Sequence, residues 1–515
     1  MKLISCLLQG DRETGHLPFA VTPRETWTRA DAISSVSRFV QRLINAGVKP
    51  EDRALAILPH DHHAVFLIAA ASAVGLRLVM PYNLQEGALG EWLGIINTYQ
   101  PQHIVCFDRC AAERLRDTGQ FPLDLGDDIF DKPSSSEPIL INAPDAIGGF
   151  LTLFSSGTTG RPKAISLSED IVARKILNVA DHLHFDSRTR AFFSGLINNT
   201  TGFIFAFGAL ANFAVLCVPE TRNIARWPDL ISKLKATHIM LRPVALDQFL
   251  SATVPGRTDL SSLKMVAYGA AAMPPETLRL ARDILSCDFV LGYGLSETFG
   301  PFAFLDEAAH RSGLSLGAQY RVGVPDKDAK VWIDTPDVDG VGEILVDGPL
   351  LMEGYIDPVT RDVVPRQGPL RTGDLGRIEA DGHLILKGRM SSSMLTPSGH
   401  RLYPEEIEAL LRSIDGVEEA VLIGLPAEDR LSLQPVACIH GDLARCGTTE
   451  VRQALRLELE RSLGREKWPD YIFASLTPFP KSANEKILKG EVARRASEAK
   501  LIALHTNRFR DIPLR

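Results

Sequence analysis

The chain has 515 residues, which is more than one ordinary hydrophobic core accommodates, so we expect at least two domains. Hydrophobic residues make up 45% and charged residues 23%, as in a globular enzyme. The 56 basic and 63 acidic residues give a net charge of −7, which argues against a polyanionic partner such as a nucleic acid.

The first 390 residues alternate helical and β-branched apolar segments, which predicts α/β layering. Helices are expected at 29–46 and 63–74, followed by a strand at 78–80. The longest apolar stretch, 203–218, is interrupted by Gly208 and Asn212, so it predicts a buried helix running into a strand rather than a membrane span.

The seven cysteines are dispersed and form no C-x-x-C pair, and the N-terminus has too short an apolar run for a secretory signal. Both features predict reduced thiols in a cytoplasmic protein.

Near residue 389 the pattern changes. Asp381-Gly382 predicts a hairpin turn, and the serine-rich segment 390–393 predicts a flexible joint. Beyond the joint, helices are expected at 404–412 and 450–463 and strands at 420–423 and 435–440. The predicted organisation is therefore a large N-terminal α/β domain at 1–389 and a small α+β C-terminal domain at 390–515.

The most informative stretch is 150–168, where an apolar strand opens into a loop of small hydroxylated residues and glycines. Glycines let backbone N–H groups approach an anion, hydroxyl groups add donors, and Arg161 and Lys163 add positive charge. The spacing does not fit the Walker pattern. The sequence predicts a phosphate-binding loop formed by Ser155, Ser156, Gly157, Thr158, Thr159, Gly160 and Lys163.

This loop resembles the phosphate-loop signature of the adenylate-forming superfamily, which contains acyl- and aryl-CoA synthetases, peptide-synthetase adenylation domains and luciferases. Further motifs follow in the family's order, and the resemblance spans roughly residues 24–495. It implies a large multi-subdomain α/β domain and a small mobile α+β lid. It also implies that Thr158 takes part in catalysis.

The next match is Tyr293-Gly-Leu-Ser-Glu297. By resemblance, the tyrosine stacks on adenine, the serine bonds a phosphate oxygen, and Glu297 is catalytic and holds Mg²⁺, a cation that prefers oxygen ligands. The small-residue stretch after the preceding strand would line the adenine. The implied nucleotide-binding residues are thus Gly269, Ala270, Ala271, Tyr293, Gly294 and Ser296. The segment 342–355 also resembles a family block, but we interpret it as structural and assign it no chemistry.

In the C-terminal motifs, the resemblance assigns Asp374 to the ribose hydroxyls, Arg389 to ribose or phosphate, and Gly399 to the passage of the thiol acceptor. Lys486 takes the place of the catalytic lysine that bridges the carboxylate and the α-phosphate. A cation there lowers the barrier to attack of an anion on an anion. The alternative is that Lys486 and its neighbours Lys481 and Lys489 form a solvated basic face.

Three positions depart from the family pattern. Serines at 391–393 replace the usual hinge residue, Glu485 replaces the glycine before the lysine, and Asn198-Asn-Thr-Thr-Gly202 replaces an aromatic gate. Candidates for the acyl pocket mix apolar and amide side chains, which would suit a medium-sized acid with one polar group. They are Phe193, Asn198, Asn199, Phe203, Gly269, Leu291 and Phe299.

The leading interpretation is ATP-dependent activation of a small carboxylic acid through acyl-AMP, with pyrophosphate release and transfer to a thiol. The expected cofactors are ATP, Mg²⁺ and coenzyme A, because Tyr403-Pro-Glu-Glu-Ile-Glu408 is closer to the CoA-ligase form of its motif. Loading of the phosphopantetheine of a carrier protein in trans is the alternative. A second alternative is a homologue that binds ATP or adenylate without turnover.

His60-Asp-His-His63 invites a metal-site interpretation. It lies at a predicted strand-to-helix junction and has no partner cluster at ligand spacing. Helix capping and surface polarity are therefore the favoured explanation.

Overall fold

The computed structural model describes residues 3, 14–81, 88–133, 148–155, 163–194, 197–254, 258–271, 273–313, 320–395, 401–426, 433–462, 468–481, 487–503 and 509–511. The chain divides into two compact units. Unit 1 contains Met1–Trp332, Leu345–Leu370 and Glu379–Leu384. Unit 2 contains Ile333–Ile344, Arg371–Ile378 and Ile385–Arg515. The domain boundary between residues 389 and 390 stays a prediction.

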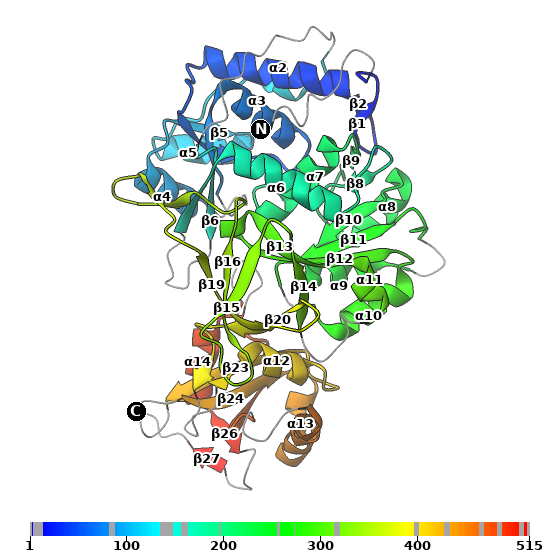
Figure 1. Cartoon of the computed structure of the whole chain (residues 1–515), viewed down its shortest axis with the longest axis vertical. Coiled ribbons are helices and arrows are strands. Elements are labelled where there is room, and N and C mark those ends of the chain that lie inside the picture. The colour runs from blue at the N-terminus through cyan, green and yellow to red at the C-terminus, as the bar shows by residue number, and fades with distance from the viewer. Residues whose placement is uncertain are drawn as a thin grey trace. The chain divides into compact units, whose positions relative to one another are not determined.

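One sheet of unit 1 has seven strands in the order β18-β17-β7-β6-β4-β3-β5 (Figure 1). Its central pairs β5–β3, β3–β4 and β4–β6 are parallel, whereas β6–β7, β7–β17 and β17–β18 are antiparallel. The strands are β3 (Arg53–Ile57), β4 (Arg77–Val79), β5 (His103–Cys106), β6 (Leu151–Ser155), β7 (Lys163–Leu167), β17 (Gly354–Ile356) and β18 (Val363–Pro365).

The helices that precede the phosphate loop are α2 (Arg29–Asn45), α3 (His63–Val74), α4 (Leu89–Tyr99) and α5 (Arg109–Asp117), with a 3-10 turn at Asp127–Phe130. Helix α2 begins at a capping box in which Thr28 and Asp31 satisfy each other's backbone N–H groups. Helix α3 is apolar around its whole circumference and every one of its residues is buried. The expectations for 29–46, 63–74 and 78–80 are confirmed to within a residue or two.

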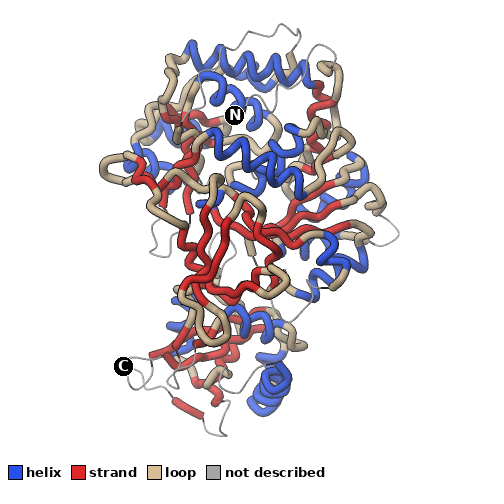
Figure 2. Tube along the Cα trace, in the orientation of Figure 1, coloured by secondary structure: helices blue, strands red, loops and turns tan. Residues whose placement is uncertain are grey.

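A second sheet contributes nine strands to unit 1, in the order β14-β13-β12-β11-β10-β8-β9-β1-β2. Figure 2 shows these strands running side by side with helices next to them. From β12 through β1 all neighbours are parallel. The strands are β1 (Pro18–Val21), β2 (Thr26–Thr28), β8 (Arg190–Phe192), β9 (Val215–Cys217), β10 (His238–Leu241), β11 (Met265–Gly269), β12 (Asp288–Leu295), β13 (Gly300–Leu305) and β14 (Arg321–Pro325).

The helices of this part of unit 1 are α6 (Glu169–His182), α7 (Thr200–Ala211), α8 (Trp227–Leu234), α9 (Pro243–Ala252), α10 (Pro275–Ile284) and α11 (Glu307–Arg311), with 3-10 turns at Ile224–Arg226 and Ser296–Thr298. Helix α7 is buried and leads into β9, as the apolar stretch 203–218 predicts. No helix in the described residues is long and apolar enough to cross a membrane.

Unit 2 contains most of β19 and β20 and parts of β15 and β16, and these four strands neighbour one another in the order β15-β16-β19-β20. They are β15 (Lys330–Asp334), β16 (Gly342–Asp347), β19 (Leu370–Ile378) and β20 (Leu384–Arg389). The predicted turn between β19 and β20 is confirmed, because Gly382 has a φ of 85° and the Glu379 N–H donates to His383 O at 2.9 Å.

The C-terminal part of unit 2 is a five-stranded sheet, β23-β24-β25-β26-β27, with helices on both faces (Figure 1). Helices α12 (Pro404–Arg412) and α13 (Thr448–Ser462) share one hydrophobic core with alternate residues of β23, and α14 (Lys489–Ser497) shares the core on the other face. The strands are β21 (Met394–Leu395), β22 (Arg401–Leu402), β23 (Glu419–Pro426), β24 (Leu433–His440), β25 (Tyr471–Ser475), β26 (Lys500–Ala503) and β27 (Phe509–Asp511), of which β21 and β22 form a separate ribbon. The α/β and α+β fold classes are confirmed.

Candidate active site

The two ends of the predicted phosphate loop lie next to each other. Strands β6 and β7 pair antiparallel with Ser155 opposite Lys163, so the chain leaves and re-enters the sheet at one point. The exposed Lys163 ammonium group lies 5.2 Å from the centre of the Tyr355 ring. The loop residues Ser156, Gly157, Thr158, Thr159 and Gly160 lie outside the described residues.

Two predicted adenine-binding segments meet at the carboxyl edge of the second sheet. Strands β11 and β12 are parallel with Gly269 opposite Gly292, so the residues that follow each strand emerge at the same edge. A Cβ atom at Gly269 would overlap Gly292 O, which explains why only glycine fits there. Ala270 has a φ of 65°, and the following Ala271 carbonyl accepts a hydrogen bond from Tyr320 Oη at 3.0 Å. Strained backbone of this kind concentrates at functional sites.

The Tyr293-to-Glu297 motif forms the end of β12 and the 3-10 turn Ser296–Thr298. Tyr293 is largely buried and packs its ring edge-on against Phe302 at 5.0 Å. A Cβ atom at Gly294 would overlap Gly300 O, because β13 turns back closely along β12. The turn fixes the backbone on which Ser296 and Glu297 stand.

Glu297 contacts a residue to which the sequence analysis gave no chemistry. The Tyr355 hydroxyl donates to Glu297 Oε1 at 3.1 Å, and the Met352 N–H donates to the Glu297 carbonyl at 2.9 Å. Tyr355 therefore lies against both Glu297 and Lys163. The family-like block at 342–355 ends at this tyrosine, but its contacts could not be deduced from that block, since they depend on the pairing of β17 with β7.

The acyl-pocket candidates fall into two groups. Phe203 is buried, stacks on Phe207 with ring centres 4.5 Å apart, and meets the ring of Phe299 edge-on at 5.5 Å. Phe193, which directly follows β8, and Leu291 within β12 are also buried. The amides have protein partners: Asn198 Nδ2 donates to Pro81 O at 3.2 Å, and Asn199 Oδ1 caps α7 by accepting from Gly202 N at 3.0 Å. The rings of Phe203 and Phe299 are brought together, whereas the amides hold the backbone at Pro81 and at the start of α7.

In unit 2 the two predicted ribose-contacting residues are ion-paired. Arg389 Nε lies 2.9 Å from Asp374 Oδ1, and Arg389 Nη1 donates to Thr372 O at 2.9 Å. Asp374 is buried on β19, and the Thr372 hydroxyl accepts from its backbone N–H at 3.0 Å. The pair thus fixes the orientation of both side chains.

The other predicted residues of unit 2, Gly399 and Lys486, lie outside the described residues. The neighbouring lysines are ion-paired: Lys489 Nζ lies 2.6 Å from Glu408 Oε1, and Lys481 Nζ lies 2.7 Å from Glu419 Oε1. Lys481 and Lys489 are thus each held by a carboxylate, and the role of Lys486 stays a prediction.

The sequence pattern of the AMP-binding enzyme family matches residues 9–356. This chain belongs to that family, within the adenylate-forming superfamily. Feruloyl-CoA synthase from Amycolatopsis sp is 27% identical over 501 residues, covering 93% of this chain and 96% of that protein. Indoleacetate–CoA ligase from Aromatoleum aromaticum is 30% identical over 355 residues, which are 66% of each chain.

Solved structures show the same fold. The acyl-adenylate complex of o-succinylbenzoate CoA synthetase from Bacillus subtilis superposes with a TM-score of 0.79 at 20% identity, covering 95% of this chain and 97% of that one. ATP-bound MatB from Rhodopseudomonas palustris gives a TM-score of 0.79 at 22% identity, covering 97% and 99%.

The histidine cluster of this AMP-binding family member is not on the surface. His62 and His63 are only 3% and 7% exposed, and their rings pack against Trp27 and Phe66. The predicted surface polarity is therefore wrong, because the junction faces the core. Asp61 does cap the helix start, accepting from His63 N at 2.9 Å.

Ligand-capable atoms of Asp61, His62 and His63 lie within 4.8 Å of one another. The ring nitrogens of His63, however, already lie 2.9 Å from Asp61 Oδ1 and 3.1 Å from Phe130 O. Burial lowers the pKa of His62 to about 3, so this imidazole is neutral within the core. The cluster is a packed aromatic group.

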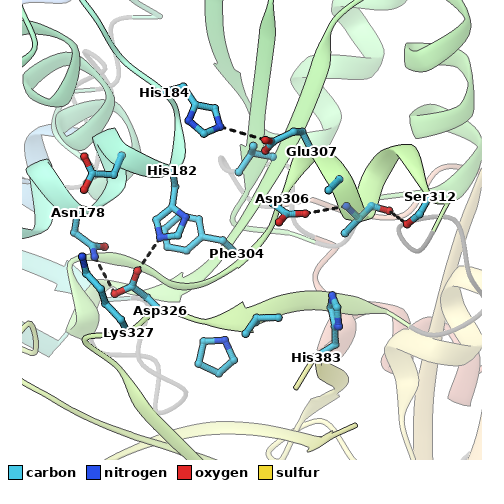
Figure 3. A pocket seen from close by; sticks show the side chains of 16 residues that line it. Asn178, His182, His184, Phe304, Asp306, Glu307, Ser312, Asp326, Lys327 and His383 are labelled. Atoms are coloured by element: carbon cyan, nitrogen blue, oxygen red, sulfur yellow. Dashed lines mark hydrogen bonds and ion pairs between the residues drawn. The ribbon is translucent and has the colours of Figure 1, made fainter. Parts of the chain in front are cut away.

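A cavity of about 770 Å³ opens between α6, α11 and β14 in unit 1 (Figure 3). His182 stacks on Phe304 with ring centres 3.7 Å apart, and its Nε2 lies 2.7 Å from Asp326 Oδ2. His184 Nε2 lies 3.3 Å from Glu307 Oε1. None of the predicted site residues lines this cavity. Its charged lining residues are four carboxylates and one lysine: Asp181, Asp306, Glu307, Asp326 and Lys327. This excess of negative charge makes the cavity unsuited to a triphosphate.

Proposed function

We propose that this protein is an AMP-forming acid–CoA ligase. A carboxylic acid attacks the α-phosphate of ATP, giving acyl-AMP and pyrophosphate. The thiol of coenzyme A then attacks the acyl carbonyl, giving the thioester and releasing AMP. The observation that carries the proposal is the meeting of Gly269–Ala271 and Tyr293–Glu297 at one sheet edge, with Tyr355 linking Glu297 to Lys163 beside the phosphate loop.

Each nucleotide group has a candidate partner within one of the two units. The strained backbone at Ala270 and the ring of Tyr293 would bind adenine, and Ser296 would donate to a phosphate oxygen. Lys163 would balance phosphate charge at the end of the loop, together with the hydroxyl groups of Ser155 and Thr158. In unit 2, Asp374 would accept from the ribose hydroxyls while Arg389 holds it in place.

Glu297 fits a magnesium ion, because it offers hard carboxylate oxygens and, among the described residues, one neutral donor holds its Oε1. A bound Mg²⁺ would neutralise phosphate charge in the reaction. The chain's own contribution is to hold Glu297 in one orientation and to place Lys163 beside it. Lys486 would supply the positive charge between the carboxylate and the α-phosphate.

Coenzyme A is favoured as the acceptor by the relatives named above, which include a CoA synthase aligned over almost the whole chain. The aromatic contacts of Phe203 with Phe207 and Phe299 offer flat apolar surface for the acyl group. Aryl acids are therefore the first substrates to try.

The test is pyrophosphate release with ATP and Mg²⁺ across aryl, aliphatic and amino acids, with and without coenzyme A. We expect turnover only with coenzyme A, and at least 100-fold slower release in Lys486→Ala with ATP binding retained. Slow release that ignores coenzyme A would indicate a carrier protein as the acceptor. No release with any acid, despite ATP binding, would contradict the proposal in favour of a binding protein.

A further inference from the structure

Tyr355 stands between two groups of opposite charge beside the phosphate loop. It lies on β17, which pairs antiparallel with β7 so that Tyr355 is opposite Ile165. Lys163, the first residue of β7, places its ammonium group 5.2 Å from the centre of the Tyr355 ring. A cation at this distance is attracted to the negative face of the ring.

On the other side, the Tyr355 hydroxyl donates to Glu297 Oε1 at 3.1 Å. Burial and the neighbouring Glu297 carboxylate both raise the pKa of Tyr355, so the phenol stays protonated and remains a donor at neutral pH. The main chain of Glu297 is held by the same segment, because Met352 N donates to Glu297 O at 2.9 Å. The side chain and main chain of Glu297 are thus both bound to the segment that carries Tyr355.

The segment is itself anchored to both strands that flank the phosphate loop. Glu353 Oε2 accepts from Gly149 N, just before β6, and from the Ser166 hydroxyl of β7, each at 2.8 Å. Glu353 N also donates to Ser166 O at 2.9 Å. Tyr355 is therefore fixed relative to the two ends of the loop.

We propose that Tyr355 is a positioning residue for the adenylation half-reaction, an inference that rests on the proposed function. Its ring holds the Lys163 ammonium group and its hydroxyl holds one oxygen of Glu297. Without Tyr355 between them, the charged groups of Lys163 and Glu297 would attract each other and form an ion pair. The aromatic ring provides each with a separate contact, so that the cation is available to phosphate and the second carboxylate oxygen to a metal ion before the nucleotide binds.

The experiment measures equilibrium binding of ATP by titration calorimetry, with no acid present, at a series of Mg²⁺ concentrations. Tyr355→Phe removes the hydroxyl and keeps the ring. We expect the half-saturating Mg²⁺ concentration to rise about 10-fold, the usual consequence of losing a hydrogen bond to a charged group. ATP binding without Mg²⁺ should stay unchanged in this variant, and should weaken about threefold in Tyr355→Leu, which also loses the contact with Lys163.

Tyr99→Phe is the matched control, because Tyr99 is a buried tyrosine of unit 1 whose ring packs on Phe154, a residue to which no site role is assigned. It should bind ATP and Mg²⁺ like the wild type. Tyr355→His retains a ring and an N–H donor and should recover most of the Mg²⁺ response. Tyr355→Leu also lacks the hydroxyl group, should show the same rise in the half-saturating Mg²⁺ concentration, and replaces Tyr355→Phe if that variant fails to fold. Thermal unfolding of each variant identifies such a failure.

A Glu297→Gln background separates positioning from a general structural role. If Tyr355 acts through Glu297, Tyr355→Phe should add no further change in the Mg²⁺ response there. An unchanged Mg²⁺ response in Tyr355→Phe alone, or an equal change in both backgrounds, would overturn the inference. Because the readout needs no acid, absence of turnover across the acid panel contradicts the ligase function without affecting this result.

Discussion

Two carboxylates of unit 1, Glu297 and Asp326, stand in opposite environments. Glu297 receives one side-chain hydrogen bond, from Tyr355 to Oε1, and no described residue donates to its Oε2. Asp326 is buried, and both of its oxygens are occupied: Asn178 Nδ2 and Asp328 N donate to Oδ1 at 2.9 Å, and His182 Nε2 lies 2.7 Å from Oδ2. A carboxylate that is oriented but only half-satisfied can still bind a ligand, whereas a saturated one holds the fold together.

The pKa of Asp326 agrees with this contrast. Burial alone would raise it, but the hydrogen bonds from His182, Asp328 N and Asn178 outweigh burial, and the pKa is lowered. Asp326 is therefore ionised and bound within the protein at neutral pH. The cavity that it lines is rich in carboxylates, so it would repel the phosphates of a nucleotide.

The largest expected effect is on catalysis. Glu297→Gln should slow pyrophosphate release about 100-fold at fixed Mg²⁺, because the amide cannot supply the negative charge that we assign to this position. Stability should change little, since the Gln carbonyl can still accept from Tyr355. The measurement is initial rate together with thermal unfolding.

The matched control is Glu307→Gln, which neutralises a carboxylate of the cavity in Figure 3 that lies 3.3 Å from His184. It should retain the wild-type rate. An equal loss of rate in Glu297→Gln and Glu307→Gln would show that the Glu297 site and the cavity of Figure 3 do not differ in their importance for catalysis.

The next effect is on stability. Asp326→Asn places an NH₂ group against donors of Asn178, His182 or Asp328 and should lower the free energy of unfolding by about 2 kcal/mol. The rate per folded molecule should be preserved. Urea unfolding at pH 7 and active-site-normalised rates check this. A loss of rate with unchanged stability would assign the cavity to the active site.

The smallest effect is a pH dependence at Lys175, a buried lysine of α6 that lines a small cavity with Asp326 and Asp328. Burial lowers its pKa to about 8, while the charges of Asp326 and Asp328 act in the opposite direction. The unfolded chain keeps this proton up to about pH 10.4, so it binds more protons than the folded chain between pH 8 and 10. The contribution of Lys175 to stability therefore increases as the pH rises through this window.

Lys175→Met should lack this increase, so that the difference in free energy of unfolding between wild type and variant changes by about 1.8 kcal/mol between pH 7.5 and 9.5. Urea unfolding at the two pH values measures it. Parallel pH profiles for the two proteins would show that the lysine stays charged in the folded state.

Local sequence features determined where most helices and strands lie and which segments carry the motifs. Helix and strand periodicity located α2, α3, α7 and the C-terminal α+β elements, because amphipathic or apolar spacing within a segment fixes how that segment is buried. Motif spacing identified the two segments that meet at the carboxyl edge of β11 and β12, since parallel neighbours bring consecutive strand ends together. The superfamily followed from these motifs in order.

Only the tertiary structure decided which distant residues touch. Tyr355 reaches Glu297 and Lys163 because β17 adds to the edge of β7, and nothing in the sequence around Tyr355 specifies that pairing. The burial of His62 and His63 under Trp27, and the saturation of Asp326 by α6, likewise depend on packing between elements far apart in the chain. Propensity and motif spacing act over a few residues, whereas strand register and side-chain satisfaction are settled by the whole fold.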